Sequence, residues 1–324
     1  MSSLRISIAM CTFNGARYLR EQLSSIASQS TLPDEVVVCD DGSSDDTIQI
    51  LSMFAEEVAF DVRIFVNEER LGVIKNFEKA IGLCDGDIIA LCDQDDIWKS
   101  HKLAKLLEAF QTDQEAIYAF SDAEMADEAG NPLDQTLWDA VGLRTDLAKF
   151  SGQRQLEMLL RKSLVTGATL AFRASFRDLI LPIPTEWMHD LWIASLGSAL
   201  SHGIPVPETL LLYRRHAAQA CGWRTKTFRQ VCEISLSASA EESWRKVEQF
   251  RELHQRVLSA PAPIRASAER LQLLKQKELH LMTRAETRST TGISRVAKVL
   301  SELRTGRYKR FSESSWYSII RDLC

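Results

Sequence analysis

The segment that decides the fold is "DIIALCDQDDIW", residues 87–98. Its first half is a continuous apolar run, which is typical of a strand buried on both faces of a sheet. Its second half places the carboxylates of Asp93, Asp95 and Asp96 within four positions. Like charges at that spacing repel one another, so the cluster costs stability unless solvent or a cation compensates it. The segment therefore predicts a buried strand that ends in an acidic turn.

The N-terminal part of the chain repeats this layout, because apolar strand patterns alternate with amphipathic helix patterns. Strands are expected within residues 4–11, 36–39, 60–72, 87–92 and 116–122. Helical spacing follows four of them and is strongest at Leu103, Leu106, Leu107 and Phe110. Such alternation predicts an α/β fold with a mostly parallel central sheet that is covered on both faces.

Polar residues gather at the ends of three of these strands. The first strand runs into "TFN", the second into "DDGSSD" and the fourth into "DQDD". Open α/β sheets bind ligands beyond the carboxyl ends of their strands. The pattern therefore predicts an acidic ligand site at one edge of the sheet.

The alternation weakens after residue 125. A short strand is expected within residues 166–173, a turn at 181–184, a helix over 188–200 and a strand within 204–216. From about residue 225 the pattern is helical, with a break at the prolines of "SAPAP". We expect a catalytic domain over residues 1–224 and a helical region over 225–324.

Composition restricts the class of protein. The chain has 324 residues, of which 45% are hydrophobic and 26% charged, as in a globular protein with a sizeable core. A formal net charge of -5 shows no basic excess of the kind that favours nucleic acid. Seven cysteines without CxxC spacing disfavour a disulfide framework and a zinc site, and indicate a reducing cytoplasm. We also expect no signal peptide and no membrane-spanning helix, since no apolar run approaches the ~18 residues that one needs.

The acidic pair Asp93-x-Asp95 suits Mg²⁺ or Mn²⁺, which prefer carboxylate oxygens and bridge to phosphates of a substrate. Taken alone, the same cluster is also typical of a solvated turn in which one aspartate, Asp96, caps the next helix. Other ligand motifs are absent from the sequence. It has no GxGxxG after the first strand, no GxxxxGK[ST] and no GxSxG, which argues against a dinucleotide site, a P-loop and a nucleophile elbow.

Several segments, taken in order, resemble the family 2 glycosyltransferases, which have the GT-A fold. The resemblance rests on "ISIAMCTFNGARYLREQLSSIASQS", "DEVVVCDDGSSDDT", "NEERLGVIKNF" and "GDIIALCDQDDIW", with correct spacing between them. The form "DQDDIW", and later "FSD", "TGATLAF", "HDLW" and "LLYRRH", look most like the bacterial rhamnosyltransferase-like branch, which builds surface polysaccharides. The resemblance covers about residues 5–217.

The resemblance implies a role for each matching residue. Those placed near the nucleotide are Thr12, Asn14, Asp41, Lys75, Asn76 and Asp93. Those placed at the divalent cation are Asp95, Asp93 and His216, with Asp95 as the direct ligand. Asp190 matches the general base, although an isolated aspartate there could simply cap a helix. The implied reaction is an inverting, metal-dependent transfer of a sugar such as rhamnose from a dTDP- or UDP-sugar to a glycan acceptor, which could be lipid-linked. Two alternatives stay open: a sugar-nucleotide nucleotidyltransferase, and a non-catalytic GT-A binding module.

The C-terminal hundred residues carry a further signal. Residues 242–258 form an amphipathic pattern that we expect to pack on the catalytic domain or on a second copy of the chain. Residues 288–310 contain seven Lys or Arg and one acidic residue, Glu302, beside an apolar stripe. A basic amphipathic helix of this kind can lie on the inner face of an anionic membrane, or can dock on the protein with a solvated basic face.

Overall fold

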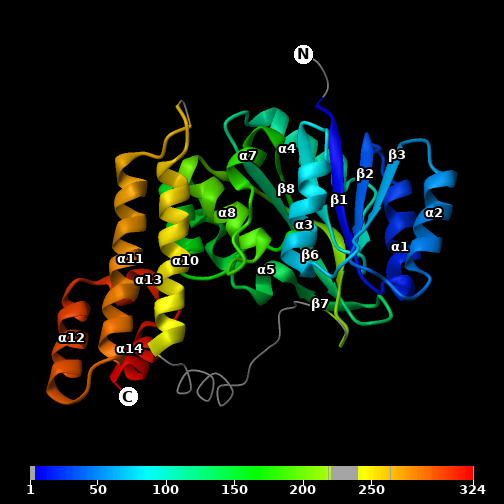
Figure 1. The fold of residues 1–324 in the computed structure, drawn as a ribbon. Coiled ribbons are helices and arrows are strands. Elements are labelled where there is room, and N and C mark those ends of the chain that lie inside the picture. The colour runs from blue at the N-terminus through cyan, green and yellow to red at the C-terminus, as the bar shows by residue number, and fades with distance from the viewer. Residues whose placement is uncertain (1–3, 218, 220–239, 263, 324) are drawn as a thin grey trace. The chain divides into compact units, whose positions relative to one another are not determined.

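The computed structural model describes residues 4–217, 219, 240–262 and 264–323 (Figure 1). They form two compact units. The first comprises residues 1–150, 164–197 and 201–222, and the second comprises 151–163, 198–200 and 223–324. The expected boundary between residues 224 and 225 lies outside the described residues.

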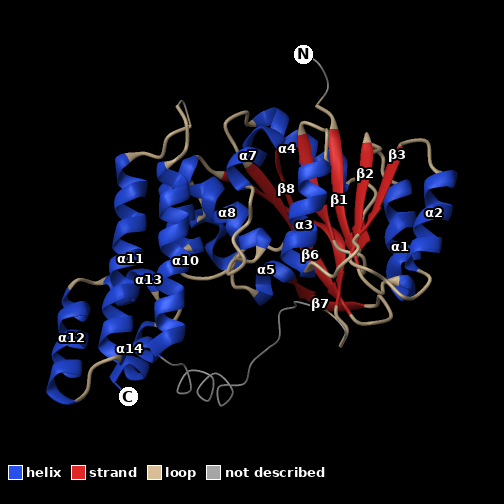
Figure 2. Cartoon of the chain, in the orientation of Figure 1, coloured by secondary structure: helices blue, strands red, loops and turns tan. Residues whose placement is uncertain are grey.

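The first unit is built on a nine-stranded sheet, counted over the described residues, in the order β3-β2-β1-β4-β8-β6-β9-β5, with β7 paired to β6 (Figure 2). Its strands are β1 (Ile6–Thr12), β2 (Glu35–Asp40), β3 (Asp61–Val66), β4 (Ile88–Cys92), β5 (Ile97–Trp98), β6 (Tyr118–Ala126), β7 (Pro132–Thr136), β8 (Leu170–Arg173) and β9 (Gly203–Arg214). Its helices are α1 (Ala16–Ala27), α2 (Thr47–Glu57), α3 (Gly72–Leu83), α4 (Lys102–Thr112), α5 (Leu137–Ala140), α7 (Arg177–Ile180) and most of α8 (His189–Leu200), with short 3-10 turns at Arg144–Lys149, Gly167–Thr169 and Ala174–Phe176.

The expectation of a mostly parallel sheet describes one half of it. Strands β3, β2, β1 and β4 are parallel neighbours. Beyond β4 the sheet is mixed, because β8 enters antiparallel between β4 and β6. β6 and β9 are parallel, whereas β5 runs antiparallel to β9. A four-residue apolar strand such as β8 carries no sequence sign of its direction, so the pattern did not predict this insertion.

Both faces of the parallel half are covered, as the continuous apolar runs predicted. Every residue of β2 and β4 is buried. Helices α1, α2 and α4 pack on one face, where the predicted stripe of α4 is buried in the main core. Helix α3 contacts β1 and β2 on the opposite face and crosses in front of the strands in Figure 1. Burying a side chain such as Phe110 stabilises the fold by roughly 1.5–3 kcal/mol.

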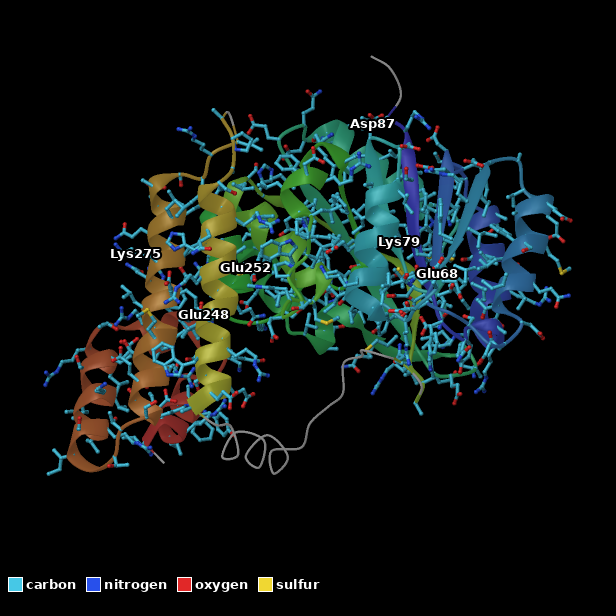
Figure 3. All side chains as sticks on the ribbon, viewed as in Figure 1. Glu68, Lys79, Asp87, Glu248, Glu252 and Lys275 are labelled. Carbon is cyan, nitrogen blue, oxygen red and sulfur yellow. The ribbon has the colours of Figure 1, made fainter. Side chains whose placement is uncertain are left out.

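The two ends of the sheet differ in chemistry. At the N-terminal end of β4, Asp87 accepts a hydrogen bond from the backbone N–H of Arg5 at 2.9 Å (Figure 3). Lys79, on α3, donates to Oδ1 of Asn67 at 2.7 Å. Asn67 follows the carboxyl end of β3 and donates to Asp41, so Lys79 contacts the end of the sheet at which the predicted ligand residues follow β1, β2 and β4.

The second unit is helical. It contains α6 (Gly152–Leu159), α10 (Ala240–Leu258), α11 (Ala268–Arg288), α12 (Gly292–Arg304), α13 (Arg307–Phe311) and α14 (Ser315–Leu323). Val247 of α10 packs against Leu281 and Ala285 of α11. The amphipathic segment 242–258 thus buries part of its apolar face on α11.

The basic segment 288–310 is not one helix. α12 ends at Arg304 and α13 begins at Arg307, with Gly306 between them at a φ of +74°. Glycine adopts this left-handed conformation without steric cost, which permits the sharp change of direction. Glu302, the one acidic residue of the segment, is buried and hydrogen-bonded to Nδ1 of His280 at 2.6 Å.

The apolar stripe of α12 is mostly exposed. Val299 is buried, but Ile293 is 89% exposed, and Val296, Leu300 and Leu303 are exposed as well. No helix among the described residues is both long and apolar enough to cross a membrane.

Candidate active site

The ends of β1, β2 and β4 meet because these three strands are parallel neighbours. Thr12 lies in register with Asp40, and Met10 with Cys92. The Thr12 hydroxyl donates to Oδ2 of Asp40 at 2.7 Å, which ties the ends of the first two strands together. The loops that carry the predicted ligand residues therefore leave the sheet side by side.

Asp40 organises the loop after β2 and was not singled out from the sequence. Its Oδ1 accepts the backbone N–H groups of Gly42 and Ser43 at 3.1 and 2.7 Å, and its Oδ2 accepts the Ser43 hydroxyl at 2.6 Å. Asn14, held at a φ of +47°, receives the Ser44 N–H on its side-chain oxygen at 2.8 Å. The first two loops are thus joined by hydrogen bonds before any ligand binds.

Asp41 lies at the end of β2 and receives three donors from the β3–α3 connection. Its Oδ1 accepts from Asn67 Nδ2 at 3.0 Å and from the Leu71 N–H at 2.7 Å, and its Oδ2 accepts from the Gly72 N–H at 2.8 Å. Asn76 supports the same network, since its Oδ1 accepts from Asn67 Nδ2 at 2.9 Å. A carboxylate offers about four lone pairs, so Asp41 keeps acceptor capacity for one more donor.

The predicted residues of α3 make protein contacts. Asn76 is buried and donates to the Cys39 carbonyl at 2.8 Å. Lys75 Nζ donates to Glu78 at 2.8 Å and to the Ile183 carbonyl at 2.9 Å. Through its contact with Asn67, Asn76 can act on a nucleotide by positioning Asp41.

The three aspartates of "DQDD" have different surroundings. Asp93 is partly exposed, and its pKa is raised to about 7 by burial and by the charges of Asp95 and Asp190. Asp95 is buried beside His216, whose Nε2 lies 2.7 Å from its Oδ2. Asp96 is fully buried, and its pKa is raised well above the usual range by burial and by the other two carboxylates.

The expectation that Asp96 caps the following helix is wrong. α4 begins at Lys102, six residues after Asp96, and its N-terminal flanking residue is His101. Instead, Oδ1 of Asp96 accepts the backbone N–H of Arg214 at 3.1 Å, and its Oδ2 has no hydrogen-bond partner in the described structure. β5 lies between Asp96 and α4, and the hydrogen bond of Asp96 joins the acidic turn to the end of β9.

Arg214 holds the acidic turn from the other side. Its Nε donates to the Asp95 carbonyl at 2.9 Å, its Nη1 to the Glu128 carbonyl at 2.8 Å, and its Nη2 to Glu21. The side chain of Arg214 is buried. Two residues on, the ring of His216 lies 4.6 Å from that of Tyr18, which fixes its orientation toward Asp95.

Gln94 joins the same turn to the first loop. Its Oε1 accepts the Phe13 N–H at 2.8 Å, and its Nε2 donates to the Phe13 carbonyl at 3.1 Å. A side chain at position 15 would collide with Gln94, so Gly15 is required for this close approach. The sequence indicates this contact with the backbone, because the amide of Gln94 can both donate and accept a hydrogen bond, whereas the neighbouring aspartates only accept when ionised.

Lys102 was also missed. It is fully buried, donates to the Ala168 carbonyl at 2.6 Å and lies 3.7 Å from the centre of the Trp98 ring. Burial lowers its pKa to about 7, against the opposing effect of Cys92 and Asp96. Its spacing of four from Leu106 places Lys102 on the apolar face of α4, which explains why it is buried.

Asp190 lies in the first turn of α8, where the helix dipole favours a negative charge. Its Oδ1 accepts the Leu191 N–H at 2.7 Å, and its Oδ2 accepts the Gly167 N–H at 3.1 Å. Its charge helps raise the pKa of Asp93, so the two carboxylates share one region. The neighbouring His189 is buried and stacks on Phe77 with ring centres 4.1 Å apart.

The donors at this site suit a hard divalent cation. Asp93 and Asp95 offer carboxylate oxygens and His216 offers a ring nitrogen, the ligand types that Mg²⁺ and Mn²⁺ accept. Among the described residues no group of three or more His, Cys, Asp or Glu has metal-binding spacing, so these three side chains are not preassembled as a cage. Mg²⁺ usually binds through one or two carboxylates and substrate phosphates, so a preassembled cage is not required for it.

The sequence is similar to that of a known protein family. Residues 7–180, more than half of the chain, match the family described as Glycosyl transferase family 2. The chain belongs to glycosyl transferase family 2. The expected family and enzyme class, a glycosyltransferase, are thereby confirmed.

Individual relatives within this family are distant. The chain is 27% identical over 219 residues to an uncharacterised glycosyltransferase of Nostoc, a match that covers 66% of each chain. It is 29% identical over 141 residues to a putative teichuronic acid biosynthesis glycosyltransferase of Bacillus subtilis, covering 44% of this chain and 55% of the relative. These matches span just under two thirds of the first relative and about half of the second.

Solved structures of similar fold cover nearly the whole chain. Staphylococcus aureus TarS 1–349 in complex with UDP-GlcNAc gives a TM-score of 0.59 at 15% identity, covering 99% of this chain and 88% of that chain. A Pyrobaculum calidifontis mannosyltransferase in complex with GDP-Man and Mn²⁺ gives 0.54 at 16% identity, covering 99% and 86%. The predicted α/β GT-A fold is confirmed by this likeness.

Gly167 provides a test of how Asp190 is positioned. A Cβ at residue 167 would lie 2.7 Å from Nε2 of His189, which is buried and cannot easily move. We expect Gly167→Ala to displace His189 and the adjacent Asp190 and to lower kcat for glycosyl transfer by roughly 10- to 100-fold, the usual effect of small misplacements. Gly82→Ala is the matched control, since its Cβ would meet only Leu181 Cδ1 at 3.7 Å. Full activity in Gly167→Ala would show that this contact does not position Asp190.

Proposed function

We propose that this family 2 glycosyltransferase is an inverting, metal-dependent enzyme that transfers a sugar from a dTDP- or UDP-sugar to a glycan acceptor. The observation that carries the proposal is the placement of Asp190 beside the acidic turn. Its carboxylate is held by the Gly167 N–H and is close enough to Asp93 to raise the pKa of that group. A base and a cation-binding cluster in one region are what such a transfer requires.

Asp190 would act as the general base. A sugar hydroxyl is a weak nucleophile, so a carboxylate must take its proton while the new glycosidic bond forms. Direct attack on the anomeric carbon, opposite the departing nucleoside diphosphate, inverts its configuration and needs no covalent intermediate. The Gly167 and Leu191 N–H groups donate to the two oxygens of Asp190 and fix the direction of its carboxylate.

Asp93, Asp95 and His216 would hold the divalent cation, Mg²⁺ or Mn²⁺. When bound, the cation stabilises the negative charge that develops on the diphosphate leaving group. Contacts within the protein hold Asp95 and His216 near the carboxyl end of β4. Arg214 does so through the Asp95 carbonyl, and Tyr18 through the ring of His216.

The loops after β1 and β2 would bind the nucleotide. Asp41 has acceptor capacity for one further donor, which matches the single imino N–H of uracil or thymine. Thr12 and Asn14 lie in the adjoining loop, already joined to the second loop through Asp40 and Ser44. This supports a pyrimidine donor, and the resemblance to the rhamnosyltransferase-like branch supports rhamnose as its sugar.

The acceptor we propose is a growing bacterial surface polysaccharide. The same motif resemblance supports this acceptor, as does the teichuronic acid biosynthesis named for the Bacillus relative. We propose that it is lipid-linked and that the helical unit contacts the inner face of the membrane. Ile293 and Leu300 are exposed on α12, within the segment 288–310, whose exposed charges are cationic because its one acidic residue, Glu302, is buried. Trp316 is exposed on α14. Such a surface fits an anionic bilayer.

The base assignment is tested by Asp190→Asn. We expect transfer to fall by about 10²- to 10⁴-fold, the usual contribution of a general base, while the donor still binds, since Asn keeps the size and an acceptor oxygen. Transfer from dTDP-rhamnose and UDP-sugars, together with donor binding by calorimetry, measures both effects. Asp61→Asn, an exposed aspartate at the opposite end of the sheet, is the control. Full transfer activity in Asp190→Asn would contradict the assignment.

The membrane contact is tested with the double variant Ile293→Gln/Leu300→Gln. We expect wild-type protein to pellet with vesicles that contain phosphatidylglycerol, and the variant to pellet several-fold less, because about 0.8 kcal/mol is lost for each CH₂ no longer buried. Leu258→Gln, which replaces a leucine 60% exposed at the end of α10, controls for loss of an exposed apolar side chain elsewhere. Equal pelleting of the double variant and wild type would contradict the contact, and a concentration-dependent dimer lost in the double variant would assign this face to a second copy of the chain.

A further inference from the structure

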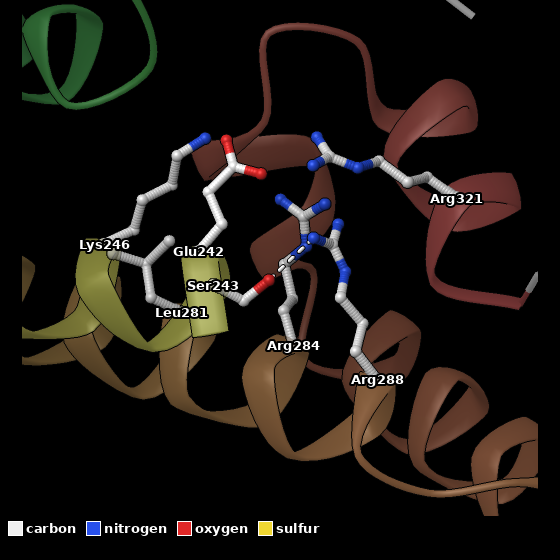
Figure 4. Close-up of a pocket in the computed structure, with 7 residues that line it drawn as sticks. All are labelled: Glu242, Ser243, Lys246, Leu281, Arg284, Arg288 and Arg321. Carbon is white, nitrogen blue, oxygen red and sulfur yellow. Dashed lines mark hydrogen bonds between the residues drawn. The ribbon is translucent and has the colours of Figure 1, made fainter. Parts of the chain in front are cut away.

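The helical unit contains a hollow lined largely by cations, outside the residues used for catalysis (Figure 4). It lies between α10, α11 and α14 and is open to solvent. Its lining residues are Glu242, Ser243, Lys246, Leu281, Arg284, Arg288 and Arg321. Four of these seven carry a positive charge, which is unusual for a hollow in a protein with an overall negative charge.

Two of the guanidinium groups are fixed in place by the buried Asp322. Arg284 Nε donates to Oδ2 of Asp322 at 2.6 Å, and Arg288 Nη2 donates to Oδ1 at 2.9 Å. The Tyr308 hydroxyl donates to Oδ2 at 2.7 Å. Burial would raise the pKa of Asp322, but Arg284 and the hydroxyl of Tyr308 hold it below the usual range, so Asp322 stays ionised. The side of this network that faces the hollow is therefore ordered without a ligand.

Among the described residues around the hollow, cationic side chains outnumber carboxylates. Asp322 and Glu242 are the carboxylates at this place, against four cationic side chains. Nε of Arg321 is buried without a hydrogen-bond partner in the described structure. An unpaired buried donor is destabilising, and a ligand with acceptor oxygens would supply the missing hydrogen bond. In Figure 4 the Arg321 and Arg284 side chains point toward the same space as Lys246.

We propose that this hollow binds a phosphoryl group, either on a small phosphorylated molecule or on the head group of a lipid. Guanidinium groups recognise phosphate oxygens through paired hydrogen bonds, and Lys246 adds a mobile positive charge. The excess of two positive charges matches a phosphate monoester or a diphosphate. α14, which supplies Arg321, also carries the exposed Trp316 and Ile320, so a phosphate borne by a lipid has apolar surface on the same helix.

The test uses the full chain in EDTA, because a divalent cation is then unavailable to draw phosphate into the acidic site. Inorganic pyrophosphate binding is measured by calorimetry, and pelleting is measured with phosphatidylcholine vesicles that contain phosphatidic acid or, as the diester comparison, phosphatidylglycerol. We expect Arg321→Gln to weaken binding by about tenfold or more, as the loss of a charged hydrogen bond predicts. Lys246→Gln, at an exposed side chain that can be changed without unfolding the unit, is the second variant. Arg265→Gln, which removes an exposed charge outside both the hollow and the basic segment 288–310, is the matched control and should bind like wild type.

The two sources give different results. Binding of pyrophosphate that is lost in Arg321→Gln assigns the site to soluble phosphate groups. Preferential pelleting with phosphatidic acid that is lost in Arg321→Gln, without pyrophosphate binding, assigns it to a lipid head group. Equal binding of both ligands by wild type, Arg321→Gln and Lys246→Gln, or no binding by wild type, would overturn the proposal. Neither donor nor acceptor sugar enters these measurements, so their outcome is independent of the transfer assay.

Discussion

Electrostatic repulsion within the acidic turn is the constraint on which the rest of the site depends. Asp93, Asp95 and Asp96 lie within four positions, and Asp190 is brought to the same region by α8. Two like charges about 4 Å apart cost about 4 kcal/mol at the effective dielectric near a protein surface. The chain meets this cost by bonding Asp96 to β9, by clamping the backbone of Asp95 with Arg214, and by placing Asp190 on backbone N–H groups. Among the described residues the Asp93 carboxylate accepts no such hydrogen bond, and the buried Lys102 only partly opposes the rise of its pKa, so a further cation would stabilise the cluster.

This arrangement gives the aspartates separate tasks. Asp96 is structural, because it is fully buried and joins the acidic turn to the strand that leads to His216. Asp95 is held against His216, whose orientation depends in turn on Tyr18 of α1. Gln94 connects the same turn to the first loop. Three loops that leave separate strands are thereby fixed to one another, so a nucleotide that contacts the loops after β1 and β2 is presented to the end of β4.

Much of this could be predicted from the sequence, for a definite reason. Strands buried on both faces produce continuous apolar runs, and their carboxyl ends were visible as abrupt changes to polar residues. The parallel half of the sheet, the apolar face of α4 and the meeting of three strand ends followed from those changes. The antiparallel entry of β8 did not, because strand direction depends on the whole path of the chain and not on four residues such as those of "LAFR".

Other features were missed because their partners are distant in sequence. The role of Asp96 depends on the N–H of Arg214, 118 positions away, whereas a helix cap requires only its neighbours. Burial of Arg214 likewise depends on Glu21 and Glu128. In the helical unit, the sequence contains a sign of the division of the basic segment between α12 and α13, because Gly306 lies between them. The pairing of Asp322 with Arg284 and Arg288 has no such sign, because it depends on how the helices pack.

In the proposed function, the acidic turn and His216 hold a divalent cation for a nucleoside diphosphate. Titration of the full chain with Mn²⁺, followed by electron paramagnetic resonance with and without UDP or dTDP, measures this binding. We expect one Mn²⁺ per chain, bound more tightly when the nucleoside diphosphate is present, and an affinity at least about tenfold weaker in Asp95→Asn. Equal Mn²⁺ affinity in wild type and Asp95→Asn, in the presence of the nucleotide, would contradict it.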